Sequence, residues 1–158
     1  MDNNDIVRRL RYALTLSNSE MAEIFKLADH DIQQCEILDI FKKEKETGYV
    51  ECSDSVLSRF LDGLIIMKRG KNESTAPKPT SPIETSLSNN MVLKKLRIAL
   101  NFKEEDMFEM FKRAEFSISK PELSALFRKQ GSKNYKACGD QILKKFLHGI
   151  TVFFRPPE

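Results

Sequence analysis

The chain has 158 residues and a net charge of +3, with 41% hydrophobic and 31% charged residues, a composition typical of globular proteins. No apolar run approaches the about 20 residues of a membrane helix, and the N-terminus lacks the apolar core of a secretory signal. Three cysteines, two histidines and no Cys-x-x-Cys pair argue against a disulfide framework or zinc site, so we expect a cytoplasmic protein without metal, cofactor or membrane contact.

The sequence contains two copies of one unit, offset by 86 residues. About a third of positions 3–66 are identical to their counterparts at that offset, without a gap, which is a clear internal repeat. Residues 69–86 between the copies are rich in Pro, Ser and Thr, as is typical of a linker. We therefore predict a first helical repeat at 1–68, a linker at 69–86 and a second helical repeat at 87–158.

Each copy is predicted to form about four short helices. The first follows the cap residues Asn3 and Asn4, or Ser88 and Asn89 in the second copy. The second opens with Ser17-x-x-Glu20, a capping-box pattern.

The third helix is clearest in the second copy, where Ser119 can cap it and Pro121 suits its first turn. Alternating β-branched runs are absent. The prediction is an all-α protein whose two homologous repeats pack together, each with a helix-turn-helix-like pair formed by its second and third helices.

A box of identical residues precedes and enters the fourth helix of each copy. We interpret it as scaffold: the aspartates as helix-start residues, the cysteines as small buried residues, and the glycines as points where another backbone comes close. The box comprises Tyr49, Cys52, Asp54 and Gly63, and in the second copy Tyr135, Cys138, Asp140 and Gly149.

The alternative interpretation of the box is a cysteine nucleophile at a helix N-terminus. The base that such a nucleophile needs is missing, because neither histidine is repeated: His148 aligns with Asp62, and His30 with Phe116. We therefore predict no catalytic residues and rank a cysteine-dependent enzyme last. Near the C-terminus, we expect Phe153 and Phe154 to complete the core.

Charge divides unevenly between the copies. Residues 1–72 carry 11 basic and 13 acidic residues, whereas residues 73–158 carry 15 and 10. A polyanion would therefore favour the second half. Its candidate nucleic-acid contacts lie on the first helix and on the outer face of the third: Lys94, Lys95, Arg97, Lys120, Ser124, Arg128 and Lys129.

Three segments carry a resemblance to a known family: Asn89-Asn90 followed by LKKLRIAL at 93–100, the C-x-D-x-x-L-x-x-F-L-x-G-L run at 52–64 followed by KRGK, and CGDQILKKFLHG at 138–149. In these the chain resembles the YehS-like family of small bacterial cytoplasmic proteins, a duplicated domain of unknown function. The resemblance implies a bacterial cytosolic setting and brings no activity or site residues.

These observations favour a non-enzymatic binding or adaptor module. Its partner is left open between a protein, which we favour, and a nucleic acid or ribonucleoprotein bound by the basic second repeat.

Overall fold

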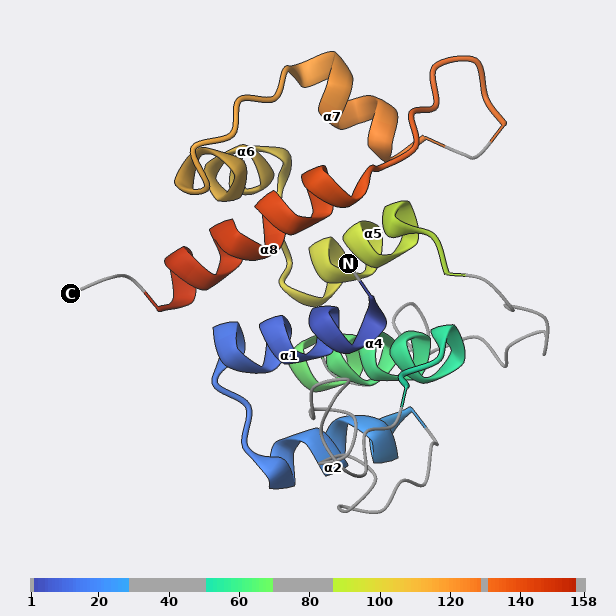
Figure 1. Ribbon diagram of the computed structural model, residues 1–158, viewed down its shortest axis with the longest axis vertical. Helices are drawn as coiled ribbons and strands as arrows, with labels where there is room; N and C mark the ends of the chain where they lie inside the picture. The colour runs from blue at the N-terminus through green and yellow to red at the C-terminus, as the bar shows by residue number, and fades with distance from the viewer. Residues whose placement is uncertain (1, 29–50, 70–86, 129–130, 156–158) are drawn as a thin grey trace.

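The computed structural model describes residues 2–28, 51–69, 87–128 and 131–155 (Figure 1). All regular structure in these ranges is α-helical, which confirms the predicted fold class. The helices are α1 (Asn3–Leu14), α2 (Asn18–Leu27), α4 (Asp54–Arg69), α5 (Asn89–Ala99), α6 (Glu104–Arg113), α7 (Lys120–Leu126) and α8 (Asp140–Phe154).

The duplication predicted from the sequence is visible in the helices. Those of the second copy begin at the offset of 86 residues from those of the first: α5 after α1, α6 after α2 and α8 after α4. The third helix of the second copy is α7. The corresponding prediction for the first copy lies at 29–50, outside the described residues.

The helix starts follow local capping chemistry. Ser17 and Glu20 form the predicted capping box, with Glu20 N donating to Ser17 Oγ over 3.1 Å and Ser17 N to Glu20 Oε1 over 3.2 Å. Ser119 caps α7 by accepting from Glu122 N at 3.3 Å. The cap of α1, however, is Asp2 rather than Asn3 or Asn4. Asn3 and Asn4 do not cap α1 because their side chains instead form hydrogen bonds with residues of the box at the start of α4.

The two repeats share one core by exchanging their first helices. Within each repeat, the second helix packs extensively on the last, α2 on α4 and α6 on α8. Each first helix instead packs mainly on the last helix of the other repeat, α1 on α8 and α5 on α4, and contacts the last helix of its own repeat only sparsely. A unit of about 65 residues has a marginal core alone, so the exchange lets both repeats bury more apolar surface.

Equivalent arginines fasten the two exchanged contacts at their ends. Arg69, at the end of α4, donates from Nη1 to Ile98 O over 3.2 Å and to Asn101 Oδ1 over 3.1 Å. Arg155, 86 residues later, donates from Nη1 to Tyr12 O over 3.1 Å. Each arginine therefore adds a second hydrogen bond to a carbonyl of the last turn of the partner helix, since Tyr12 O already accepts from Thr15 N and Ile98 O from Asn101 N.

The expectation that Phe153 and Phe154 complete the core is wrong. Their exposed fractions are 40% and 41%. Phe153 touches Phe102 edge-on, with ring centroids 6.3 Å apart, and Arg113 of α6 lies over its ring, but both phenylalanines are on the last turn of α8 and stay exposed. Core positions of this helix end at Ile150.

Candidate functional site

The first two residues of α1 and α5 tie each first helix to the box of its own repeat. Asn3 Nδ2 donates to Cys52 O over 3.0 Å and to Asp54 Oδ1 over 2.7 Å. Asn89 Nδ2 makes the same two bonds, to the Cys138 carbonyl at 3.1 Å and the Asp140 carboxylate at 2.8 Å. The polar link thus exists in both copies although the two helices barely pack on each other.

The second asparagine of each pair is buried and completes this link. Asn4 Oδ1 and Asn90 Oδ1 each accept from the backbone N–H of the box cysteine at 2.8 Å. Asn90 Nδ2 also donates to Leu126 O and Lys136 O, both at 2.9 Å. The Asn90 side chain therefore joins the start of α5 to the end of α7 and to the segment that precedes α8.

The box aspartates are helix-start residues, as predicted, because they are the first residues of α4 and α8. Their carboxylates accept from the asparagines at the start of α1 and α5. In the first repeat, Ser53 Oγ accepts from Val56 N at 3.2 Å. Asp54 also accepts from Leu87 N at 2.9 Å, which links the box to the second repeat. The hydrogen bond from Asn89 is the main cause of a lowered pKa of Asp140.

The box cysteines lie in surroundings that suppress thiolate formation. Cys52 and Cys138 are 3% and 6% exposed. Burial, reinforced by the charge of Asp54, raises the pKa of Cys52 to about 12. Burial and the charge of Asp140 raise the pKa of Cys138 to about 11, a smaller rise because Lys136 and the backbone of α8 oppose it. A thiol in such an environment is a small apolar packing group rather than a nucleophile.

The box glycines lie where two helices cross at backbone contact. A Cβ added at Gly63 would lie 1.9 Å from Ile24 O on α2, and one added at Gly149 would lie 1.8 Å from Met110 O on α6. No side chain fits at that distance, so glycine allows α2 to approach α4, and α6 to approach α8.

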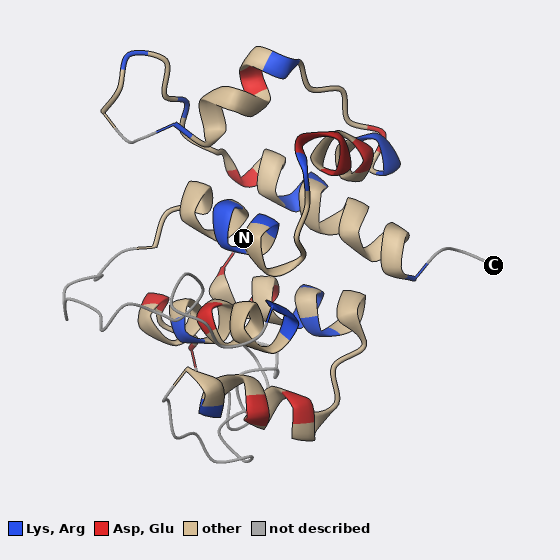
Figure 2. Cartoon of the chain, turned by 180° about the vertical axis from the view of Figure 1, so that it is seen from behind, with Lys and Arg blue, Asp and Glu red and all other residues tan. Residues whose placement is uncertain are grey.

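The structure separates the candidate nucleic-acid contacts into two groups. Lys95 pairs with Asp62, and Arg97 donates from Nε to Phe102 O over 3.3 Å. These two side chains hold the fold together. The exposed candidates are Lys94, Lys120, Ser124 and Arg128. Lys129 and Tyr49 lie outside the described residues. Figure 2 shows the Lys and Arg residues of α1 and α5 in blue, in the middle of the molecule.

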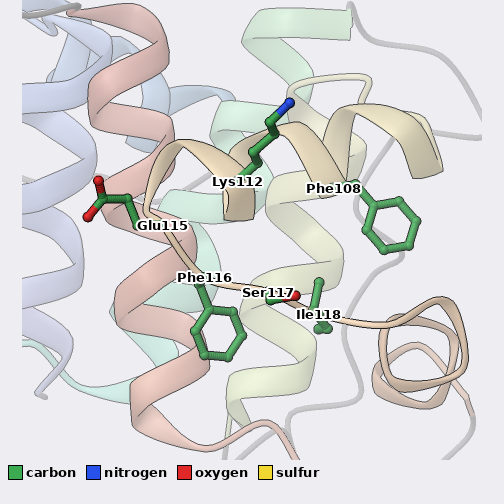
Figure 3. Close-up of a pocket in the computed structure, with 6 residues that line it drawn as sticks. All are labelled: Phe108, Lys112, Glu115, Phe116, Ser117 and Ile118. Atoms are coloured by element: carbon green, nitrogen blue, oxygen red, sulfur yellow. The ribbon is translucent and has the colours of Figure 1, made fainter.

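A hollow of about 370 Å³ lies beside the segment that joins α6 to α7, the pair predicted to resemble a helix-turn-helix. Figure 3 shows the Lys112 ammonium and the Glu115 carboxylate directed away from the Phe116 ring. The hollow thus lacks converging polar groups that could act on a substrate. Its lining is Phe108, Lys112, Glu115, Phe116, Ser117 and Ile118.

The described residues contain no group of three or more His, Cys, Asp or Glu side chains that could hold a metal ion. In the same ranges, no helix is both long and apolar enough to cross a membrane.

Sequence reasoning missed an exposed cluster at the C-terminal ends of α1 and α8, which lie side by side (Figure 1). Tyr12 is 58% exposed, and the Arg155 guanidinium stacks 4.1 Å from its ring centroid. The Phe153 and Phe154 rings meet edge-on at 4.9 Å, and Arg113 lies 5.2 Å from the Phe153 ring. We call these five residues the aromatic patch. Tyr12 carried a signal, since Ile98 replaces it in the second copy.

Comparison with known proteins adds a family. Residues 3–70 and 89–155 match the sequence profile described as "Protein of unknown function (DUF1456)". The chain belongs to the DUF1456 family. It is also 41% identical over 152 residues to the uncharacterized protein YehS of Escherichia coli (strain K12), covering 96% of each chain. No solved structure matches. The resemblance noted from the sequence is confirmed, and both matches leave the function open.

Proposed function

We propose that this protein is a non-enzymatic binding module of the cytoplasm and that its partner is a protein. The aromatic patch carries the proposal. Tyr12, Phe153 and Phe154 are the only large hydrophobic side chains of the described chain that are strongly exposed. The two phenylalanine rings meet, and Arg155, the next residue along the chain, stacks on Tyr12. Aromatic rings beside arginine are the composition enriched where proteins bind proteins.

The patch has the physical properties of a binding surface. Its rings are apolar, so covering them gains hydrophobic free energy. The stacking of Arg155 on Tyr12 and the hydrogen bond from Arg155 to the Tyr12 carbonyl hold the arginine in place before any partner arrives. Ordering it in advance lowers the entropic cost of association.

The polar residues that could have suggested an enzyme act within the fold instead. The asparagines bond to backbone and carboxylate, and the thiols are buried. This supports an expectation of no catalysis, and the free thiols suit a reducing cytoplasm.

A capture experiment tests the proposal. Immobilised protein is exposed to nuclease-treated lysate of the bacterium that encodes it, at about 0.5 M salt to screen charge contacts. We expect a protein partner that the wild type retains and that the variant Tyr12→Ser/Phe154→Ser loses, with an unchanged circular dichroism spectrum.

The variant Lys120→Gln/Arg128→Gln is the matched control, because it changes two exposed residues on the basic surface of the second repeat. It should capture the partner as the wild type does. Loss of binding in this control, or material that the wild type retains only from lysate not treated with nuclease, would instead support the nucleic-acid alternative.

A further inference from the structure

A hollow of about 450 Å³ lies between α1 and α8, in one of the two contacts where the repeats exchange helices. Three basic side chains line it: Arg8 and Arg9 from α1, and His148 from α8. The rest of the lining is Asp5, Tyr12 and Thr151. Its volume is in the range of small-molecule sites.

The equivalent position in the other exchanged contact contains an ion pair. There, Asp62 of α4 pairs with Lys95 of α5, and their side chains are only 10% and 14% exposed. At the offset of 86 residues, Asp62 corresponds to His148 and Lys95 to Arg9. The acidic partner is thus absent from the contact between α1 and α8, and basic groups stand in both places.

The charge around the hollow is not balanced locally. Asp5 supplies its one carboxylate and already pairs with Arg8. Arg9 forms no ion pair with any described residue of the chain. In the contact of α4 with α5, Asp62 and Lys95 form a salt bridge. The corresponding positions in the contact of α1 with α8 are His148 and Arg9, which both line the hollow and can donate hydrogen bonds from nitrogen. Such a pair suits an anion that accepts several hydrogen bonds.

The remaining lining indicates what the anion is attached to. Thr151 Oγ1 donates to Leu147 O over 2.9 Å, so toward the hollow it can accept from a ligand hydroxyl. The Tyr12 ring offers an apolar wall. We propose that this hollow binds a small organic phosphate, with Arg9 and His148 on the phosphate group. The hollow shares Tyr12 with the aromatic patch, but Arg9 and His148, which would hold the phosphate, lie outside that patch.

The test uses glycerol phosphate, with inorganic phosphate as second probe, at constant ionic strength. The sequence contains two histidines, so a His30→Gln variant identifies the His148 imidazole signal in the proton spectrum. We expect this signal to shift with saturation below about 10 mM, a modest affinity for a site of this size. We expect titration calorimetry to give tighter binding for glycerol phosphate than for inorganic phosphate. An unmoved His148 signal would overturn the proposal.

The decisive variant is Arg9→Lys/His148→Asp, which rebuilds here the ion pair of the equivalent contact. Because that contact already accommodates the pair, we expect the variant to fold with a melting temperature no lower than that of the wild type. It should bind glycerol phosphate at least about tenfold more weakly, since a carboxylate now occupies the anion position. The control Lys120→Gln should bind as the wild type does. Equal binding by the double variant would show that the hollow is not the site.

Discussion

The contact of α4 with α5 and the contact of α1 with α8 are equivalent in the duplicated fold, yet they differ in charge. Each ends in an arginine that donates to a carbonyl of the partner helix, Arg69 in one and Arg155 in the other. Among the described residues, only the first contains an ion pair that joins its two helices, between Asp62 and Lys95. The duplication has thus kept the arginine hydrogen bonds at the ends of the two contacts and changed the charged residues inside them, and the changed positions are where function is best sought.

The largest expected effect tests the shared part of the comparison. Gly63→Ala and Gly149→Ala each place a carbon within 2 Å of a carbonyl oxygen of the neighbouring helix, at 1.9 Å and 1.8 Å. The helices must separate, so we expect each variant to lose about 3 kcal/mol or more of the free energy of unfolding, measured in urea.

The control for the glycines is Gly139→Ser. A Cβ at Gly139 meets nothing within 4 Å, and the first repeat has Ser53 at the same place. This substitution should leave stability within about 0.5 kcal/mol of the wild type. If Gly63→Ala and Gly149→Ala behaved like the control, the close helix crossings would be wrong.

The next effect concerns the buried asparagines. Asn90→Ala leaves one backbone N–H and two carbonyls without the partner they had, at Cys138, Leu126 and Lys136. We expect a loss of about 3 kcal/mol of unfolding free energy, because unsatisfied buried groups keep their full desolvation cost. Ser124→Ala, at an exposed position of α7, is the control and should change little. A loss below about 1 kcal/mol in Asn90→Ala would assign the link no structural role.

The cysteines test whether the two boxes are equally inert. With pKa values raised to about 12 for Cys52 and about 11 for Cys138, native thiols at pH 8 should react with iodoacetamide at least about a hundredfold more slowly than in unfolded protein. Cys138 should react faster than Cys52. Mass mapping of the modified peptides measures both rates, and rapid native labelling would revive the nucleophile alternative.

The raised thiol pKa values also give a pH dependence of stability. The folded state holds these protons more tightly than the unfolded state, whose thiols titrate near 9.0. Their contribution to stability is therefore fully present below pH 9 and is lost as the pH rises through about 11 and 12. Urea titrations should show a decline in that window that is smaller in Cys52→Ala/Cys138→Ala.

The sequence predicted those parts of the fold that are coded locally. The offset of 86 residues follows from comparing the sequence with itself. The Ser17 and Ser119 caps could be predicted because capping uses neighbours in the chain. The exchange of first helices was not, since the apolar stripe of α1 has the same pattern whether it meets α4 or α8. Burial of Phe153 was predicted wrongly because apolar character does not say whether another helix covers the residue.

The candidate site was readable only in part for the same reason. The alignment of Asp62 with His148 was plain in the sequence, but its meaning depended on Lys95 and Arg9, which lie on helices of the other repeat. A pair between helices of different repeats is a long-range contact, and the spacing of apolar residues along the sequence carries no information about it.

The smallest effect tests the charge difference itself. Asp62→Asn should lose about 1 kcal/mol of unfolding free energy, because Lys95, whose side chain is largely buried, then keeps its charge without the carboxylate. A double-mutant cycle with Lys95→Gln should give an attractive coupling of about 1 kcal/mol. The same cycle with Arg9→Gln and His148→Gln should give none, or a repulsive one, because neither side chain carries negative charge. Equal couplings in the two cycles would mean that the contacts do not differ electrostatically, and would remove the reason for an anion to enter only one of them.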